Sequence, residues 1–123
     1  LPPRATVFIV ASKSGSTIEV TSLESYFRDW LAGHGIDTPG RHLVAITDPG
    51  TSLVTHAGAH GYRHTFINPE DIGGRFSALS LFGLVPAALM GIDPARLLDA
   101  AAPMADACRS DGQDNPGTAL GLF

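Results

Sequence analysis

A strand that runs directly into a hydroxyl-rich turn and then a helix constrains this chain most. Residues 5–11 are apolar and β-branched, which is typical of a strand buried on both faces. Residues 12–17 read Ser-Lys-Ser-Gly-Ser-Thr, and apolar residues at helical spacing follow without a spacer. The free N–H groups and the positive dipole end of that helix should face the turn. Four hydroxyls, one ammonium and a flexible glycine at such a position suit a phosphate monoester.

Capping and nucleotide binding compete with phosphate-monoester binding at this turn. Ser16 and Glu19 have the spacing of a capping box, which would account for both residues without a ligand. A nucleotide-binding P-loop requires a glycine five residues before its lysine, and Phe8 occupies that position. The P-loop is therefore excluded, whereas capping stays open.

The remaining pattern predicts an α/β domain with a parallel sheet. Strands and helices alternate with short connections, so the sheet should be flanked by helices, and ligands should bind beyond the carboxyl ends of its strands. Residues 110–123 are turn-rich and then apolar over a stretch too short to predict an element. The predicted elements are strand 5–11, helix 17–32, strand 42–47, helix 51–59, strand 62–67, helix 79–90 and helix 94–108.

Composition narrows the class of protein and of partner. A net charge of -4 argues against a general affinity for nucleic acid, and no apolar run reaches the length of a membrane span. Cys108 is the only cysteine, which excludes an intrachain disulfide and favours a reducing cytoplasm; we expect its thiol to be buried. Because the chain opens at Leu1 without Met, we expect it to be a piece of a longer protein.

A second segment of the sequence supports a functional interpretation of the hydroxyl-rich turn. Residues 71–80 read Asp-Ile-Gly-Gly-Arg-Phe-Ser-Ala-Leu-Ser, and residues 12–19 read Ser-Lys-Ser-Gly-Ser-Thr-Ile-Glu. In this order and spacing the two segments resemble the sugar isomerase (SIS) domain of the phosphoglucose isomerase family. The resemblance extends from about Ala5 to at least Met90 and is closest to the isomerase half of bacterial transaldolase/phosphoglucose isomerase fusions.

The resemblance implies a three-layer, flavodoxin-like SIS domain with a parallel sheet. SIS sheets usually have more strands than the three predicted here, so we expect a truncated domain. Residues 1–123 would form one domain with a core over 5–109, and residues 110–123 would begin a segment that leads to a missing second half.

The resemblance also implies that four residues of the turn hold the 6-phosphate of an open-chain hexose phosphate, namely Ser12, Lys13, Ser14 and Thr17. Hydroxyls, backbone N–H groups and one cation spread the charge of a dianion over several charge-assisted hydrogen bonds. Many relatives carry Thr at the position of Ser14, and the hydroxyl is kept here.

Arg75 would stabilise the enediolate through which aldose and ketose interconvert. A fixed cation aimed at the developing charge lowers the barrier more than it tightens binding of the ground state. Gly73 and Gly74 would let the backbone approach the sugar, although without the resemblance they describe an ordinary turn. Glu19 matches a motif glutamate near the active site whose role there is structural.

The groups that complete the reaction are not found in this chain. The family takes a catalytic glutamate from a motif further along the chain and a ring-opening histidine from the neighbouring subunit, and neither motif occurs before Phe123. We therefore expect a domain of a homodimeric glucose-6-phosphate isomerase of glycolysis and gluconeogenesis, which needs no metal or organic cofactor. The isolated chain should not turn over.

Two different functions compete with the isomerase. A non-catalytic sugar-phosphate-binding SIS module, as found in regulators, stays open. Another SIS isomerase or a sugar-phosphate lyase is disfavoured, because simpler SIS proteins lack the segment Gly-Gly-Arg-Phe-Ser that is present at residues 73–77.

Three further features have both a structural and a functional interpretation. His56, His60 and His64 are spaced four apart, but Gly61 should end the helix before His64, so we expect two exposed histidines instead of a metal site. Asp48 could line the site or only organise the Pro-Gly turn after it. Finally, the i, i+4 spacing of residues 24 and 28, Glu and Arg, predicts an exposed ion pair.

Overall fold

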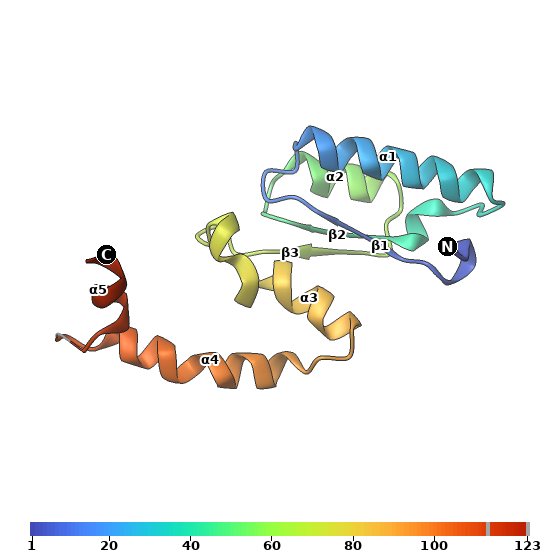
Figure 1. Cartoon of the computed structure of the whole chain (residues 1–123). Helices are drawn as coiled ribbons and strands as arrows, with labels where there is room; N and C mark the ends of the chain where they lie inside the picture. Colours follow the sequence, from blue (N-terminus) through green and yellow to red (C-terminus); the bar gives the residue numbers. More distant parts are fainter. Residues whose placement is uncertain (113, 123) are drawn as a thin grey trace. The chain divides into compact units, whose positions relative to one another are not determined.

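The computed structural model describes residues 1–112 and 114–122 (Figure 1). The chain divides into two compact units, Leu1–Pro86 and Ala87–Phe123, and each is described by itself. With η denoting a 3-10 helix, the elements are η1 Pro3–Ala5, β1 Phe8–Ala11, α1 Ile18–Gly33, η2 Pro39–His42, β2 Leu43–Thr47, α2 Ser52–Ala59, β3 His64–Ile67, η3 Gly74–Leu79, α3 Leu81–Leu89, α4 Pro94–Arg109 and α5 Pro116–Gly121.

The first unit is built on a parallel sheet with the strand order β1-β2-β3, which confirms the predicted α/β class. Every residue of β2 is buried, as expected for an apolar strand with a neighbour on each side. Ala11 pairs with Ile46, and Thr47 pairs with Ile67, so the carboxyl ends of all three strands lie at one edge. The loops that follow these strands therefore start side by side.

The core of this unit lies between the sheet and the two helices α1 and α2, which Figure 1 shows on the same face of the sheet. Leu31 anchors α1 and is fully buried, and Gly35 adopts a φ of 75° just beyond the end of the helix. The buried cluster that joins β1, β2 and α2 consists of Val10, Leu43, Ala45, Leu53 and Ala57.

The second unit consists mainly of α4 and α5. Asp93 caps α4, since its side chain accepts a hydrogen bond of 2.9 Å from the backbone N–H of Ala95. Cys108 is exposed on this helix, so the expectation of a buried thiol was wrong. No helix of the described residues has the length and apolar character that crossing a bilayer requires.

The tail contains an element that the sequence pattern did not predict. Asn115 accepts hydrogen bonds from the backbone N–H groups of Gly117 and Thr118, and Pro116 occupies the first helical position of α5. An N-cap asparagine followed by proline is a strong helix start, and it outweighs the shortness of the apolar pattern. Residues 113 and 123 of the segment expected to lead to a missing second half lie outside the described residues.

All three strands start later than the sequence predicted, the second by one residue, at Leu43 instead of residue 42. The first begins at Phe8, because Pro3–Ala5 forms a 3-10 turn, and the third begins at His64 instead of residue 62. Pro86 lies inside α3 without ending it.

The packing makes a direct prediction about stability. Replacing the fully buried Leu43 by Ala should lower the free energy of unfolding by about 2–5 kcal/mol, since it removes apolar contacts and leaves a cavity in the core. Replacing Ile18, which is 71% exposed, by Ala should change it by less than about 0.5 kcal/mol. Urea denaturation of both variants measures the difference, and equal losses would contradict the assignment of the core.

Candidate active site

The loop between β1 and α1, residues 12–17, curls around the hydroxyl of Ser12. Ser12 is buried, and its Oγ accepts a hydrogen bond of 3.1 Å from the backbone N–H of Gly15 and lies 3.0 Å from Oγ1 of Thr17. Gly15 adopts a φ of 70°, and a Cβ at this position would lie 2.7 Å from Cβ of Thr51. Both the conformation and the space therefore require glycine at this position.

Residues at the end of β2 and at the start of α2 hold the hydroxyl-rich turn through hydrogen bonds. Ser52 donates a hydrogen bond of 2.9 Å to the carbonyl of Gly15, and Oγ1 of Thr47 lies 2.7 Å from Oγ1 of Thr51. Thr47 Oγ1 also donates to the carbonyl of Lys13 over 3.4 Å. The backbone of the turn is thus held by hydroxyls of β2 and of the start of α2.

The start of α1 contradicts the capping hypothesis. Thr17 is the N-cap and makes no side-chain capping bond, while Oγ of Ser16 donates to Oγ of Ser14 over 3.2 Å. Glu19 is exposed. A capping box needs its serine at the N-cap, and here the helix begins one residue too late for Ser16. Among the residues that the structure describes, the N–H groups of the first turn consequently have no side-chain acceptor, and they lie next to the exposed hydroxyls of the loop.

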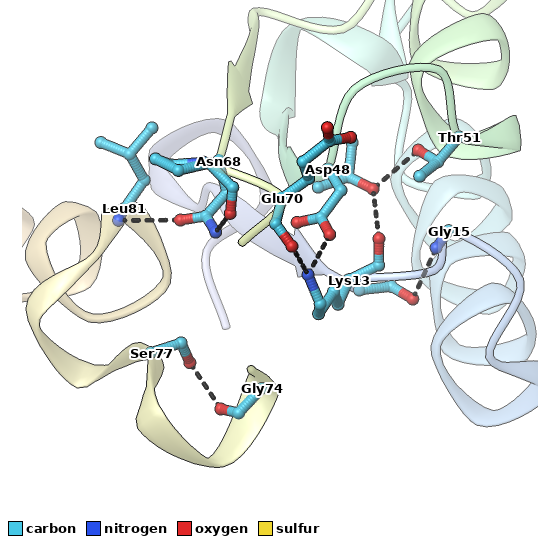
Figure 2. Close-up of polar contacts among 12 residues, drawn as sticks. Lys13, Gly15, Asp48, Thr51, Asn68, Glu70, Gly74, Ser77 and Leu81 are labelled. Carbon is cyan, nitrogen blue, oxygen red and sulfur yellow. Dashed lines mark hydrogen bonds and ion pairs between the residues drawn. The ribbon is translucent and has the colours of Figure 1, made fainter. Parts of the chain in front are cut away.

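Lys13 connects the hydroxyl-rich turn to the loops that follow β2 and β3 (Figure 2). Its Nζ forms an ion pair with Oδ2 of Asp48 and donates a hydrogen bond of 2.9 Å to the carbonyl of Glu70. The side chain of Asp48 is only 12% exposed, and its Oδ1 is buried without a hydrogen-bond partner among the described residues. Asp48 therefore contacts the site and does more than shape the turn that follows it.

Residues 71–80, which contain Gly73, Gly74 and Arg75 and are called the glycine–arginine segment below, follow β3 after a short connection. Asn68, which is almost fully buried, donates from its backbone N–H to the carbonyl of Thr47 over 2.8 Å. Its Oδ1 accepts a hydrogen bond of 3.1 Å from the N–H of Leu81, the first residue of α3. Both ends of the intervening loop are thus fixed by one residue.

Within that loop, η3 carries the predicted arginine. Arg75 is exposed, as are Gly73 and Gly74, and Ser77 donates a hydrogen bond of 2.7 Å to the carbonyl of Gly74 (Figure 2). A Cβ on Gly73 would lie 3.3 Å from the ring of Phe76, whereas a Cβ on Gly74 would meet nothing. Only Gly73 is therefore crowded, and the backbone of Gly74 is open to solvent.

One hydrogen bond links the hydroxyl-rich turn to the neighbourhood of the second segment: Nζ of Lys13 donates to the carbonyl of Glu70, which directly precedes residues 71–80. Ser14, Thr17 and Arg75 are all exposed. That these residues contact a sugar phosphate stays a prediction. Sequence reasoning missed Glu70 and Asn68: a backbone carbonyl leaves no signal in the sequence, whereas an Asn-Pro pair at a strand end could have indicated Asn68.

A second polar cluster lies under α1. Glu24 is buried, and its Oε1 accepts hydrogen bonds from Nε of Arg28 at 3.0 Å and from the hydroxyl of Tyr62 at 2.8 Å. The predicted pair with Arg28 exists, but its expected exposure was wrong, because Tyr62 and α2 cover this part of the helix. His56 Nε2 lies 3.3 Å from the same oxygen without hydrogen-bond alignment.

The pKa of Glu24 reflects two opposing effects. Burial favours the neutral carboxyl group and raises its pKa, but the hydrogen bond from Tyr62 and the nearby His56 and Arg28 outweigh burial, so the pKa lies below its ordinary value of 4.5. Burial and the contact with Glu24 raise the pKa of Tyr62 in turn. Glu24 is therefore ionised and its charge is compensated.

Among the described residues, no three His, Cys, Asp or Glu side chains lie close enough together to hold a metal ion. His56 is half-buried, not exposed as expected, and its ring lies 4.3 Å from that of His60. A cavity of about 320 Å³ opens beside His56 and reaches Gly15 and Ser52, but neither Ser12 nor Arg75 lines it. Of the hydroxyl-rich turn, only Gly15 borders this cavity.

The cluster under α1 predicts a pH-dependent stability. Because the pKa of Glu24 is lowered, its stabilisation is fully present above pH 4.5 and is lost as the pH falls through the folded value. Tyr62→Phe removes a hydrogen bond to a charged group and should lower the free energy of unfolding at pH 7 by about 1.5–3 kcal/mol. The difference from the unmodified protein should shrink below pH 4.5.

Urea denaturation at pH 7 and at pH 3 checks this expectation. Tyr26→Phe is the matched control, since Tyr26 lies on the same helix as Glu24 and is 61% exposed. A loss for Tyr62→Phe that is equal at both pH values would show that the hydroxyl does not act through the carboxylate.

Comparison with known families gives a consistent result. The family model described as "Phosphoglucose isomerase" matches residues 1–116. A glucose-6-phosphate isomerase of Trichormus variabilis is 40% identical over 119 residues, which cover 96% of this chain and 22% of that protein. The corresponding protein of Thermus thermophilus is 43% identical over 99 residues, covering 80% of this chain and 24% of that protein. The chain thus spans less than a quarter of the length of these relatives.

Solved structures agree with the sequence comparison. A hypothetical protein of Thermus thermophilus superposes with a TM-score of 0.89 at 38% identity, and the match covers 99% of this chain and 30% of that one. A glucose-6-phosphate isomerase of Chlamydia trachomatis gives a TM-score of 0.62 at 34% identity, with 69% of this chain and 16% of that one covered.

Proposed function

The chain belongs to the phosphoglucose isomerase family, and on that premise we propose that it is the part of a glucose-6-phosphate isomerase that binds the sugar phosphate. The relatives are named for the isomerisation of glucose 6-phosphate, and this chain spans less than a quarter of their length. In this proposal the chain supplies the phosphate loop and the arginine that stabilises the enediolate.

The uncapped start of α1 supports phosphate binding most directly. The first-turn N–H groups have no side-chain acceptor, and the hydroxyls of Ser12 and Thr17 lie 3.0 Å apart beside them. A phosphate monoester carries a charge of about -1.5 to -2 at neutral pH and accepts several charge-assisted hydrogen bonds. Ser14 adds an exposed hydroxyl. An ammonium has three donors, of which Lys13 uses two within the protein, so one is left for a phosphate oxygen.

In the proposed reaction, a proton moves between C1 and C2 of the open-chain sugar through a cis-enediolate. The negative charge of this intermediate develops on oxygen, where the Arg75 guanidinium would lower the barrier. The exposed backbone at Gly73 and Gly74 would let the sugar approach closely. The general base and the ring-opening histidine would come from the rest of the enzyme.

Other attributes of the parent enzyme are proposals that follow from the family resemblance. They are a homodimeric assembly, a cytoplasmic location, a role in glycolysis and gluconeogenesis, and a reaction without metal or organic cofactor. A transaldolase fused to the isomerase stays a prediction, because the two relatives described above are named glucose-6-phosphate isomerase alone.

Binding can be measured on the chain as it is. Calorimetric titration of fructose 6-phosphate should give saturable binding, and Arg75→Ala should weaken it by about 10- to 100-fold, since a hydrogen bond to a charged group contributes about 1.5–3 kcal/mol. Arg96→Ala is the control, because Arg96 is also exposed but lies on α4. An affinity that Arg75→Ala leaves unchanged would remove this arginine from the sugar.

The isolated chain should be inactive. Its residues include no proton-transfer motif, so a coupled assay for fructose 6-phosphate formation should give no rate above the buffer blank, even at saturating glucose 6-phosphate. A parallel assay of Arg75→Ala identifies contaminating host isomerase, whose rate would not depend on the variant. A rate that is lost in Arg75→Ala would overturn the expectation of inactivity.

A further inference from the structure

Lys13 is the only lysine in the chain, and its side chain reaches the loops that follow the other two strands. It follows β1, its partner Asp48 follows β2, and its partner Glu70 follows β3. Figure 2 shows the ammonium between the Asp48 carboxylate and the Glu70 carbonyl. One side chain thus joins all three loops at the carboxyl edge of the sheet.

Lys13 is held at its backbone as well as at its ammonium. Its carbonyl accepts a hydrogen bond of 3.3 Å from the N–H of Asp48 and one of 3.4 Å from the hydroxyl of Thr47. The two ends of the residue are therefore fixed to the same stretch of chain, residues 47–48. A long, flexible side chain fixed in this way has little freedom left, and its ammonium keeps a constant position relative to the phosphate loop.

The hydrogen bond from Lys13 to Glu70 lies at the start of the glycine–arginine segment. Glu70 directly precedes Asp71, and Asn68 ties the far end of the segment by accepting from Leu81. In the described part of the chain, the bond from Lys13 to Glu70 is the one hydrogen bond between residues 12–17 and residues 69–81. This bond is thus the direct polar link between the phosphate loop and the start of the arginine segment.

Asp48 explains why the ammonium is oriented toward the sheet edge. Its carboxylate is almost buried, and Oδ1 has no hydrogen-bond partner in the described residues, so Lys13 is the cation that compensates this charge. A buried carboxylate that loses its cation is costly, and the pair therefore favours one side-chain conformation of Lys13.

We propose that Lys13 and Asp48 are positioning residues that hold the Arg75-bearing segment in register with the phosphate loop. The part of this inference that concerns ligands rests on the proposed function. A Lys13 that only bound phosphate would affect all phosphate ligands alike. A Lys13 that positions Arg75 affects a ligand that reaches Arg75 more than a ligand confined to the loop.

The first test needs no ligand. NMR spectra of the 123-residue protein are compared for the unmodified chain, Lys13→Met and Asp48→Asn, with Asp106→Asn as the control for an exposed pair with Arg109. Backbone amides of residues 71–79 should shift and exchange their hydrogens about tenfold faster in the first two variants, and stay unchanged in the control. The more conservative Asp48→Asn keeps the test decisive if Lys13→Met does not fold. Unchanged amides over 71–79 in Asp48→Asn would overturn the proposal.

The second test compares two ligands. Inorganic phosphate can occupy only the loop, whereas fructose 6-phosphate would extend from the loop to Arg75. Lys13→Met should weaken fructose 6-phosphate about tenfold more than phosphate, and this additional loss should vanish in the Arg75→Ala background. Equal losses for both ligands would make Lys13 a simple phosphate ligand. If neither ligand binds the unmodified chain while residues 71–79 still shift in the variants, the proposed function fails and the positioning role stands.

The single lysine gives the first, ligand-free test an independent readout. In protein labelled only at lysine, one side-chain ammonium signal is expected, and Asp48→Asn should abolish its protection from hydrogen exchange. A signal that is equally exposed in both proteins would contradict an ammonium held by Asp48.

Discussion

The burial of β2 between two parallel neighbours is the constraint on which the rest of the first unit depends. All five of its residues are buried and all but Thr47 are apolar, and the register of the strand fixes where the chain leaves the sheet on either side. Parallel strands all end at the same edge, and for this reason three loops with little sequence in common start next to one another. The chemistry at this edge is therefore a consequence of how the core packs.

Two carboxylates show how the protein handles charge next to this core. Asp48 is compensated by one ammonium, and its second oxygen is left without a partner among the described residues, so its position depends on Lys13. Glu24 is compensated by Arg28, Tyr62 and the nearby His56, which explains its lowered pKa despite burial. The first arrangement connects loops at the site, whereas the second fastens α1 to its surroundings. Asp48 thus belongs to the candidate site, whereas Glu24 stabilises the packing of α1.

The sequence predicted the order of elements well and local contacts less well. Helix and strand periodicity depends on burial along one element, so α1, β2 and α2 were placed within a residue or two. The capping box at Ser16 failed because residue spacing alone does not fix where a helix begins, and here Thr17 is the N-cap. The exposure of Glu24 failed because Tyr62, far away in the sequence, covers it. In the tail, the signal of Asn115 and Pro116 was present in the sequence and was given too little weight.

By itself the sequence determined the α/β class, the hydroxyl-rich turn before the first helix and the two motifs that mark the family, since periodicity and residue type act over short stretches of chain. Only the tertiary structure decided that the start of α1 is left uncapped, that Asp48 is buried and that Lys13 reaches Glu70. The reason is physical: the ends of the Lys13 hydrogen bond are 57 residues apart in the chain, and only the parallel register of the strands brings them within bonding distance.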